Sequence, residues 1–118
     1  MDLTSRTAQL CMAGTQAEFE RRLDDARRIF SQAWEVATNA YEAAMAAHYI
    51  AHLAPDPAAA LEWDLEALRR ARLDARTDEF LPSLYLSLGG SYERIGDADQ
   101  ANRYFELAGG LGLVHQPG

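Results

Sequence analysis

The chain has 118 residues, 48% of them hydrophobic, which is enough for one domain with a buried core. Its net charge of −7 argues against nucleic-acid binding, because a nucleic-acid-binding protein needs a positive surface to displace counterions from phosphates. A single cysteine, Cys11, excludes an internal disulfide framework and a zinc site built from several cysteines.

The signals of membrane and secreted proteins are also missing. No stretch reaches the roughly 18 consecutive apolar residues of a membrane span. Residues 1–6 lack the basic region and the apolar run of a signal peptide. We therefore predict a cytoplasmic protein with no membrane partner.

Helix-forming residues dominate the whole chain, and no apolar run alternates as a strand would. In the first half, Leu23-Asp24 marks a break after a pair of arginines. Asp56-Pro57 is typical of a helix start, since an aspartate caps well and the missing N–H of proline costs nothing at the first helical position.

Further helix signals follow in the second half. Asp78 is a candidate cap, with Pro82 in the first turn of the helix that it would begin. Asp97 followed by Gln100 resembles a capping box. The predicted helices span residues 4–21, 24–37, 39–53, 57–74, 79–94 and 98–109, and short connections make consecutive helices antiparallel neighbours.

A pattern of small and aromatic residues recurs along these helices. In the last two it consists of Tyr85, Leu88-Gly89, Tyr92, Ala101, Phe105 and Ala108. In the first two it consists of Leu10, Ala13-Gly14, Ala17, Ala26, Phe30 and Ala33. Ala60 follows Ala26 by 34 residues, which is the period of one class of helical repeat. The pattern resembles the tetratricopeptide repeat (TPR) family, although Leu113 stands where that family often has a proline.

The resemblance implies a single all-α domain, a right-handed solenoid of three helix-turn-helix units with about six antiparallel helices. The units span residues 7–40, 41–81 and 82–115. Gly89, facing Ala101 and Ala108, would let paired helices approach closely, and Tyr92 and Phe105 would fill the space toward the next unit. An ordinary helical bundle is the alternative.

The middle unit departs from the pattern at two positions. His48 replaces the small residue at the helix crossing, and Asp64 replaces the aromatic residue, with Ala60 and Ala67 on either side. We predict that His48 and Asp64 form a buried polar pair, hydrogen-bonded across the hairpin, because neither could be buried unpaired cheaply. The alternative register uses Ala47, Ala59 and Trp63, but it leaves Glu66 at a buried position.

Seven additional residues separate the second and third units, because Ala60 and Ala101 are 41 residues apart rather than 34. Either the helices around residues 68–82 are lengthened, or a loop is inserted at residues 75–77.

The resemblance implies that partners bind at exposed positions of the first helix of each unit. In the first unit these are Cys11, Thr15 and Glu18. In the second they are Glu42, Met45, Tyr49 and His52, and in the third Leu86, Gly90, Glu93 and Arg94. Family members that clamp a carboxylate use lysine and asparagine on this face, whereas glutamates stand here, so an apolar or basic segment suits it better. Alternatively, Tyr49 and Met45 only pack against neighbouring first helices.

We therefore predict a non-catalytic module or adaptor that binds a protein or peptide, without a cofactor. A regulatory protein that senses a small molecule or signalling peptide is the alternative, which a cavity around His48, Tyr49, Asp64 and Trp63 would favour. A metal-binding or enzymatic protein using His48 and His52 is less favoured, because no acidic residue lies between these histidines.

The segment after Ala108 is rich in glycine and apolar residues. Leu111, Leu113 and Val114 could fold back as a lid over the last unit. Alternatively, the uncapped end of the array forms a homodimer, because a stacked repeat must cover its exposed face.

Overall fold

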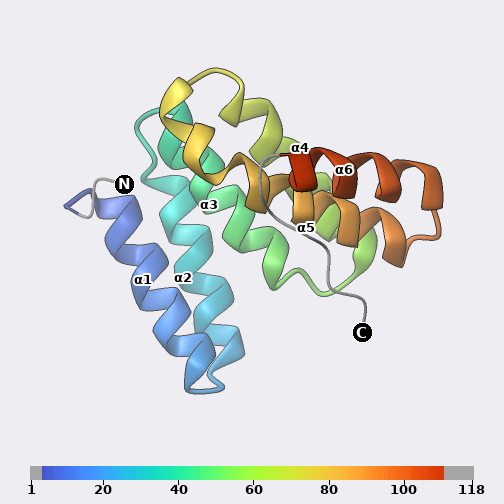
Figure 1. The fold of residues 1–118 in the computed structure, drawn as a ribbon. Coiled ribbons are helices and arrows are strands. Elements are labelled where there is room, and N and C mark those ends of the chain that lie inside the picture. The colour runs from blue at the N-terminus through green and yellow to red at the C-terminus, as the bar shows by residue number, and fades with distance from the viewer. Residues whose placement is uncertain (1–3, 111–118) are drawn as a thin grey trace.

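Residues 4–110, which the computed structural model describes, fold into six α-helices and one short 3-10 helix (Figure 1). The elements are α1 (Arg6–Phe19), α2 (Leu23–Glu35), α3 (Ala40–His52), α4 (Pro57–Ala71), η1 (Ala75–Phe80), α5 (Leu81–Arg94) and α6 (Ala98–Gly110). The bounds of the α-helices differ from the predicted ones by at most three residues. None of these helices is long and apolar enough to cross a membrane.

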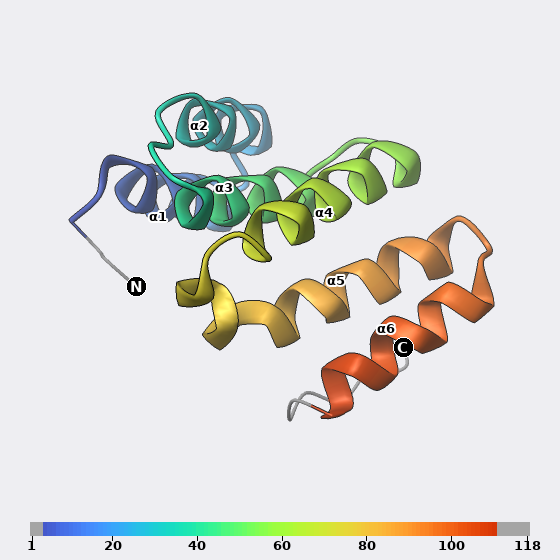
Figure 2. The ribbon, with the colours of Figure 1, turned by 90° about the horizontal axis from the view of Figure 1, so that it is seen from above.

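Consecutive helices pack as antiparallel hairpins (Figure 2). The three pairs are α1 with α2, α3 with α4, and α5 with α6. Contacts of α2 with α3 and of α4 with α5 join successive hairpins, and α1 also contacts α3. The predicted all-α class with about six antiparallel helices is therefore confirmed.

Local capping explains most of the helix bounds. The Asp56 carboxylate accepts a hydrogen bond from the Ala59 N–H at 2.8 Å, and Asp97 accepts one from the Gln100 N–H at 3.1 Å, so both predicted caps are confirmed. The break before α2 lies slightly earlier than predicted. It contains Arg21, which has a positive φ of 64° and cannot continue a right-handed helix.

The prediction of a cap at Asp78 is wrong, because Asp78 lies inside η1. Asp74 caps η1 instead, accepting a hydrogen bond from the Arg76 N–H at 2.9 Å. The helix α5 then begins without a side-chain cap, and Pro82 lies in its first turn as predicted. The additional residues between α4 and α5 thus form a turn and η1, which supports the inserted loop over lengthened helices.

Glycine and phenylalanine meet at the crossings of the first and third hairpins. A Cβ atom at Gly14 would lie 2.9 Å or less from three ring carbons of Phe30, and one at Gly89 would lie 3.0 Å or less from three ring carbons of Phe105. The sequence reasoning placed alanines opposite Gly89, whereas the ring of Phe105 lies there. Each glycine leaves the space that its aromatic partner fills.

The middle hairpin is built differently. His48 and Asp64 are sixteen residues apart, the same spacing as the two glycine–phenylalanine pairs. Ala60, Asp64 and Ala67 are all buried, while Ala59 and Glu66 are only half-buried, as the favoured register predicts. The structure therefore supports that register.

The predicted hydrogen bond between His48 and Asp64 is wrong. The two carboxylate oxygens of Asp64 accept hydrogen bonds from the hydroxyls of Ser87, at 2.8 Å, and Ser91, at 2.6 Å. These serines lie one turn apart on α5, so they offer one donor to each oxygen, which a single histidine N–H could not do. Asp64 consequently ties α4 to α5 rather than to α3.

The predicted lid over the last unit concerns residues outside the described range. Leu111, Leu113 and Val114 follow Gly110, the last described residue.

Candidate functional site

A cavity of about 330 Å³ lies beside α3. We call it the α3 cavity. Seven residues line it, namely Tyr41, Met45, His48 and Tyr49 from α3, Glu79 and Phe80 from η1, and Ser83 from the first turn of α5. The cavity is thus formed between the middle helix of the chain and the segment that interrupts the repeat period.

The sequence of α3 explains why these side chains share one face. Tyr41, Met45 and His48 are separated by four and three residues, which places them on one side of a helix. The other side is made of buried alanines, including Ala44 and Ala47, which pack with residues of α4 and α5. The small alanines let α3 approach α4 and α5 closely, and the larger residues on the other side of α3 line the cavity.

Glu42, a predicted binding residue, has a local role at the start of α3. Asn39 caps the helix by accepting a hydrogen bond from the Glu42 N–H at 2.8 Å. In return, the Glu42 carboxylate accepts hydrogen bonds from the N–H of Thr38, at 3.0 Å, and from its hydroxyl, at 3.1 Å. This reciprocal cap fixes where α3 begins.

Met45 and Tyr49 both pack against the first hairpin and line the cavity. Met45 is buried in a cluster that includes Cys11 of α1. The ring of Tyr49 stacks on Phe30 of α2, with 5.0 Å between ring centroids and an angle of 21° between planes. The two interpretations of Met45 and Tyr49, partner binding and packing against a neighbouring helix, are therefore compatible, because both side chains contact the first hairpin and line the cavity.

His48 contributes an uncharged ring to the lining. Its Nδ1 atom is buried and has no hydrogen-bond partner. Burial lowers the pKa of His48 to about 4, and the positive charge of His52 acts in the same direction. The ring is therefore neutral at pH 7.

His52, the last of the binding residues predicted in the second unit, lies outside the cavity lining. Its Nε2 atom is 2.8 Å from Oε2 of Glu18, so the pair bridges α3 and α1. Glu18 and His52 are 34 residues apart and were both predicted on the partner-binding face. Among residues 4–110, no group of three or more His, Cys, Asp or Glu side chains is placed to hold a metal ion.

The predicted binding residues of α5 are also absent from the cavity lining. Leu86 is half-buried, while Glu93 and Arg94 are exposed. A terminal nitrogen of Arg94 donates a hydrogen bond to the Ser91 hydroxyl at 3.1 Å, which extends the network around Asp64. Burial raises the pKa of Asp64, and the hydrogen bonds from Ser91 and Ser87 oppose that shift.

The remaining wall of the cavity comes from η1, whose residues were predicted as a loop at 75–77 and as the start of a helix at residue 79. Thr77 is buried and donates a hydrogen bond to the carbonyl oxygen of Ala71 at 2.7 Å, which ties η1 to the end of α4. This folding brings the ring of Phe80 within 5.7 Å of the ring of Tyr41, measured between centroids. The guanidinium carbon of Arg76 lies 5.0 Å from the Tyr41 ring centroid.

Sequence reasoning missed four lining residues, namely Tyr41, Glu79, Phe80 and Ser83. Tyr41 carried a usable signal, because it lies four residues before Met45 on the same helix face. The other three belong to the inserted segment or follow it directly, and their position depends on how that segment folds back.

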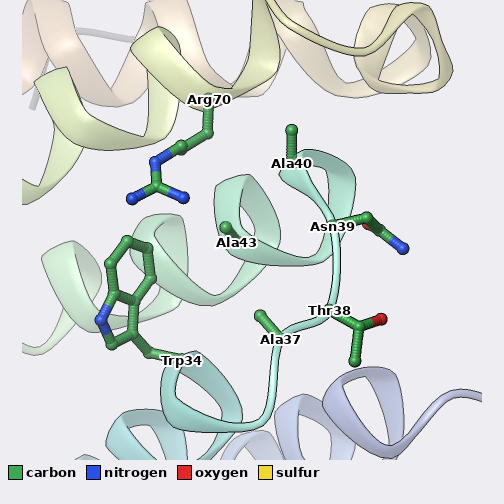
Figure 3. A pocket seen from close by; sticks show the side chains of 7 residues that line it. All are labelled: Trp34, Ala37, Thr38, Asn39, Ala40, Ala43 and Arg70. Carbon is green, nitrogen blue, oxygen red and sulfur yellow. The ribbon is translucent and has the colours of Figure 1, made fainter.

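A second pocket, of about 280 Å³, lies between the end of α2, the start of α3 and α4 (Figure 3). Trp34 forms one side of it, and the guanidinium carbon of Arg70 lies 5.0 Å from the indole ring centroid. Nε of Arg70 donates a hydrogen bond to Glu66 at 2.9 Å, one turn earlier on α4. This pocket was not predicted, and it contains none of the predicted binding residues.

Comparison with known proteins adds no assignment: no family model matches the chain, and no match was found among curated proteins or solved structures.

Proposed function

We propose that this protein is a non-catalytic interaction module that binds a protein or peptide partner at the α3 cavity. We further propose that its three hairpins form a right-handed solenoid of the tetratricopeptide type, with α1, α3 and α5 on the concave face. The recurrence of the glycine–phenylalanine crossing in the first and third hairpins supports this second proposal.

The α3 cavity is the observation that carries the proposed function. Protein interfaces are typically anchored by a few side chains that fill pockets on the partner, and aromatic residues and methionine are enriched there. Tyr41, Tyr49, Phe80 and Met45 supply that chemistry, and about 330 Å³ is large enough to admit one large side chain. An anchor residue of the partner would occupy this space.

The placement of the hydroxyl groups supports a non-catalytic role. Ser87 and Ser91 both donate their hydroxyl protons to Asp64. Ser91 is also fully buried, so a substrate could not reach its oxygen. The hydrogen bonds of these two hydroxyls to Asp64 stabilise the contact between α4 and α5.

A peptide library selected against the protein tests this proposal. The diagnostic variant is Ser83→Phe, which places an aromatic ring at an exposed position of the cavity wall. The control is Asn102→Phe, which adds the same ring to an exposed position on α6, away from the cavity. We expect selected peptides to bind Asn102→Phe like the original protein and Ser83→Phe about tenfold more weakly or worse. Equal binding to both variants would contradict the proposal.

A small-molecule sensor is the second candidate function, and the volume of the α3 cavity favours it. Small-molecule pockets span roughly 300–1,000 Å³, and this cavity lies at the lower end of that range. His48 and Tyr49 line it as the sensor hypothesis requires, but Asp64 and Trp63 do not. A thermal-shift screen of small metabolites, with Ser83→Phe as the control, tests this candidate. Compounds that stabilise both proteins equally would count against it.

A further inference from the structure

We propose that the α3 cavity accepts the cationic side chain of a lysine or arginine residue of the partner. This inference rests on the proposed function and adds the chemistry of the anchor residue. It follows from the aromatic lining, from the charges around the cavity, and from a contact that the protein already makes with one of its own arginines.

The lining suits a long side chain that ends in a cation. Tyr41, Tyr49 and Phe80 present aromatic rings, and Met45 adds a polarizable thioether. An aliphatic stem would be buried against these groups, and the cationic end would be attracted to the negative face of a ring. A carboxylate would find only repulsion from such faces.

The charge at the cavity is negative, which would attract a cationic side chain. Glu79 is the only one of the seven lining residues that carries a charge at pH 7, because the His48 ring is neutral there. A cation entering the cavity would therefore meet negative potential.

The protein itself shows that the Tyr41 ring attracts a cation. Arg76 places its guanidinium carbon 5.0 Å from the centroid of that ring. Arg76 is also paired with Asp74, with 2.6 Å between its terminal nitrogen and the carboxylate, so its charge is balanced locally. Arg76 itself is not among the residues that line the cavity.

Three probes of equal length test the proposal: n-pentylammonium, 1-pentanol and pentanoate. Each is titrated into the isotope-labelled protein at constant ionic strength, and the shifts of the amides around the cavity are followed by NMR. We expect pentylammonium to bind about fivefold more tightly than pentanol, and pentanoate to bind most weakly. Glu79→Gln should reduce the preference for the ammonium, whereas Glu93→Gln, at an exposed position of α5 outside the cavity, should not.

The outcomes separate this inference from the proposed function. Pentanol binding as tightly as pentylammonium would overturn the cationic anchor while leaving an apolar anchor in place. No shift with any probe would also overturn it, and the peptide selection would then decide the function independently. An unchanged preference in Glu79→Gln would likewise overturn the role of that carboxylate.

A chemical readout is available because all eleven basic residues of the chain are arginines. With no lysine in the chain, a carbodiimide can couple an added amine to a carboxylate with little competition from side chains. We expect pentylamine to couple to Glu79 faster than to Glu93, as measured by mass spectrometry of peptides. Equal coupling at the two positions would overturn the proposal.

Discussion

Replacing three glycines of the chain by alanine, one at a time, tests how tightly the helices cross. In an exposed helix, this replacement stabilises a protein by about 1 kcal/mol, because glycine loses more backbone freedom on folding than alanine does. Gly90 provides the reference, since a Cβ atom there would have no neighbour within 4 Å. We therefore expect Gly90→Ala to raise the free energy of unfolding by about 1 kcal/mol.

Gly14→Ala, by contrast, should lower the free energy of unfolding. The new Cβ atom would lie 2.9 Å or less from three ring carbons of Phe30, whereas carbon atoms in contact prefer roughly 3.5–4.0 Å. Phe30 is fully buried and stacked on Tyr49, so its ring has no free direction in which to move. Overpacking of this kind costs about 1–3 kcal/mol, and with the gain in helix propensity we expect a net loss of about 2 kcal/mol.

The effect of Gly89→Ala on the free energy of unfolding should lie between the effects of Gly90→Ala and Gly14→Ala. The distances to the Phe105 ring are similar, but Phe105 is only half-buried, whereas Phe30 is fully buried. We expect the strain and the propensity gain to cancel within about 1 kcal/mol. Urea denaturation followed by circular dichroism measures all three variants. If Gly14→Ala and Gly90→Ala change the free energy of unfolding equally, the inference of a tight crossing is refuted.

Three further predictions concern buried titratable groups. The pKa of His48 is lowered to about 4, so the folded protein binds fewer protons at this residue than the unfolded chain does. The stability that results is present above pH 6.5 and is lost as the pH falls toward 4, by up to about 3 kcal/mol. Thermal melts of His48→Gln should lack this loss. The pKa of Asp64 is raised mainly by burial, so its effect on stability has the opposite pH dependence: stability falls as the pH rises through the pKa of Asp64 in the folded protein. Asp64→Asn should remove this fall, and an unchanged dependence of stability on pH in that variant would refute the assignment. Burial raises the pKa of the Cys11 thiol to about 12. A thiol reagent at pH 8 should therefore label Cys11 in urea but not in the folded protein. Rapid labelling without urea would show that α1 opens readily.

The helices could be predicted because their signals are local. A cap such as Asp56 hydrogen-bonds to a residue three positions away, so the sequence contains both partners within one turn. The failure at Asp78 has a related cause, because Asp74 is an equally good cap four residues earlier. Local chemistry permitted both, and the packing of η1 on α4 and α5 selected between them.

The candidate site was predictable only on the side that a single helix supplies. Met45 and Tyr49 were predicted as binding positions from the family resemblance, and His48 was predicted at a cavity only under the sensor hypothesis; all three line the cavity from α3. Phe80 lies almost forty residues further along the chain, and no periodicity relates it to Tyr41. Its place opposite that ring results from η1 folding back, which Thr77 secures through its hydrogen bond to Ala71.

The pair of His48 and Asp64 separates what the sequence by itself determined from what only the tertiary structure decided. The repeat pattern predicted that a histidine and an aspartate occupy the positions of a small residue and an aromatic one, and the burial of Asp64 in the structure agrees with that register. It did not show which groups would bond to Asp64. The donors, Ser87 and Ser91, are more than twenty residues away on another hairpin. A buried carboxylate takes the donors that packing brings within reach, and that packing depends on the fold of the whole chain.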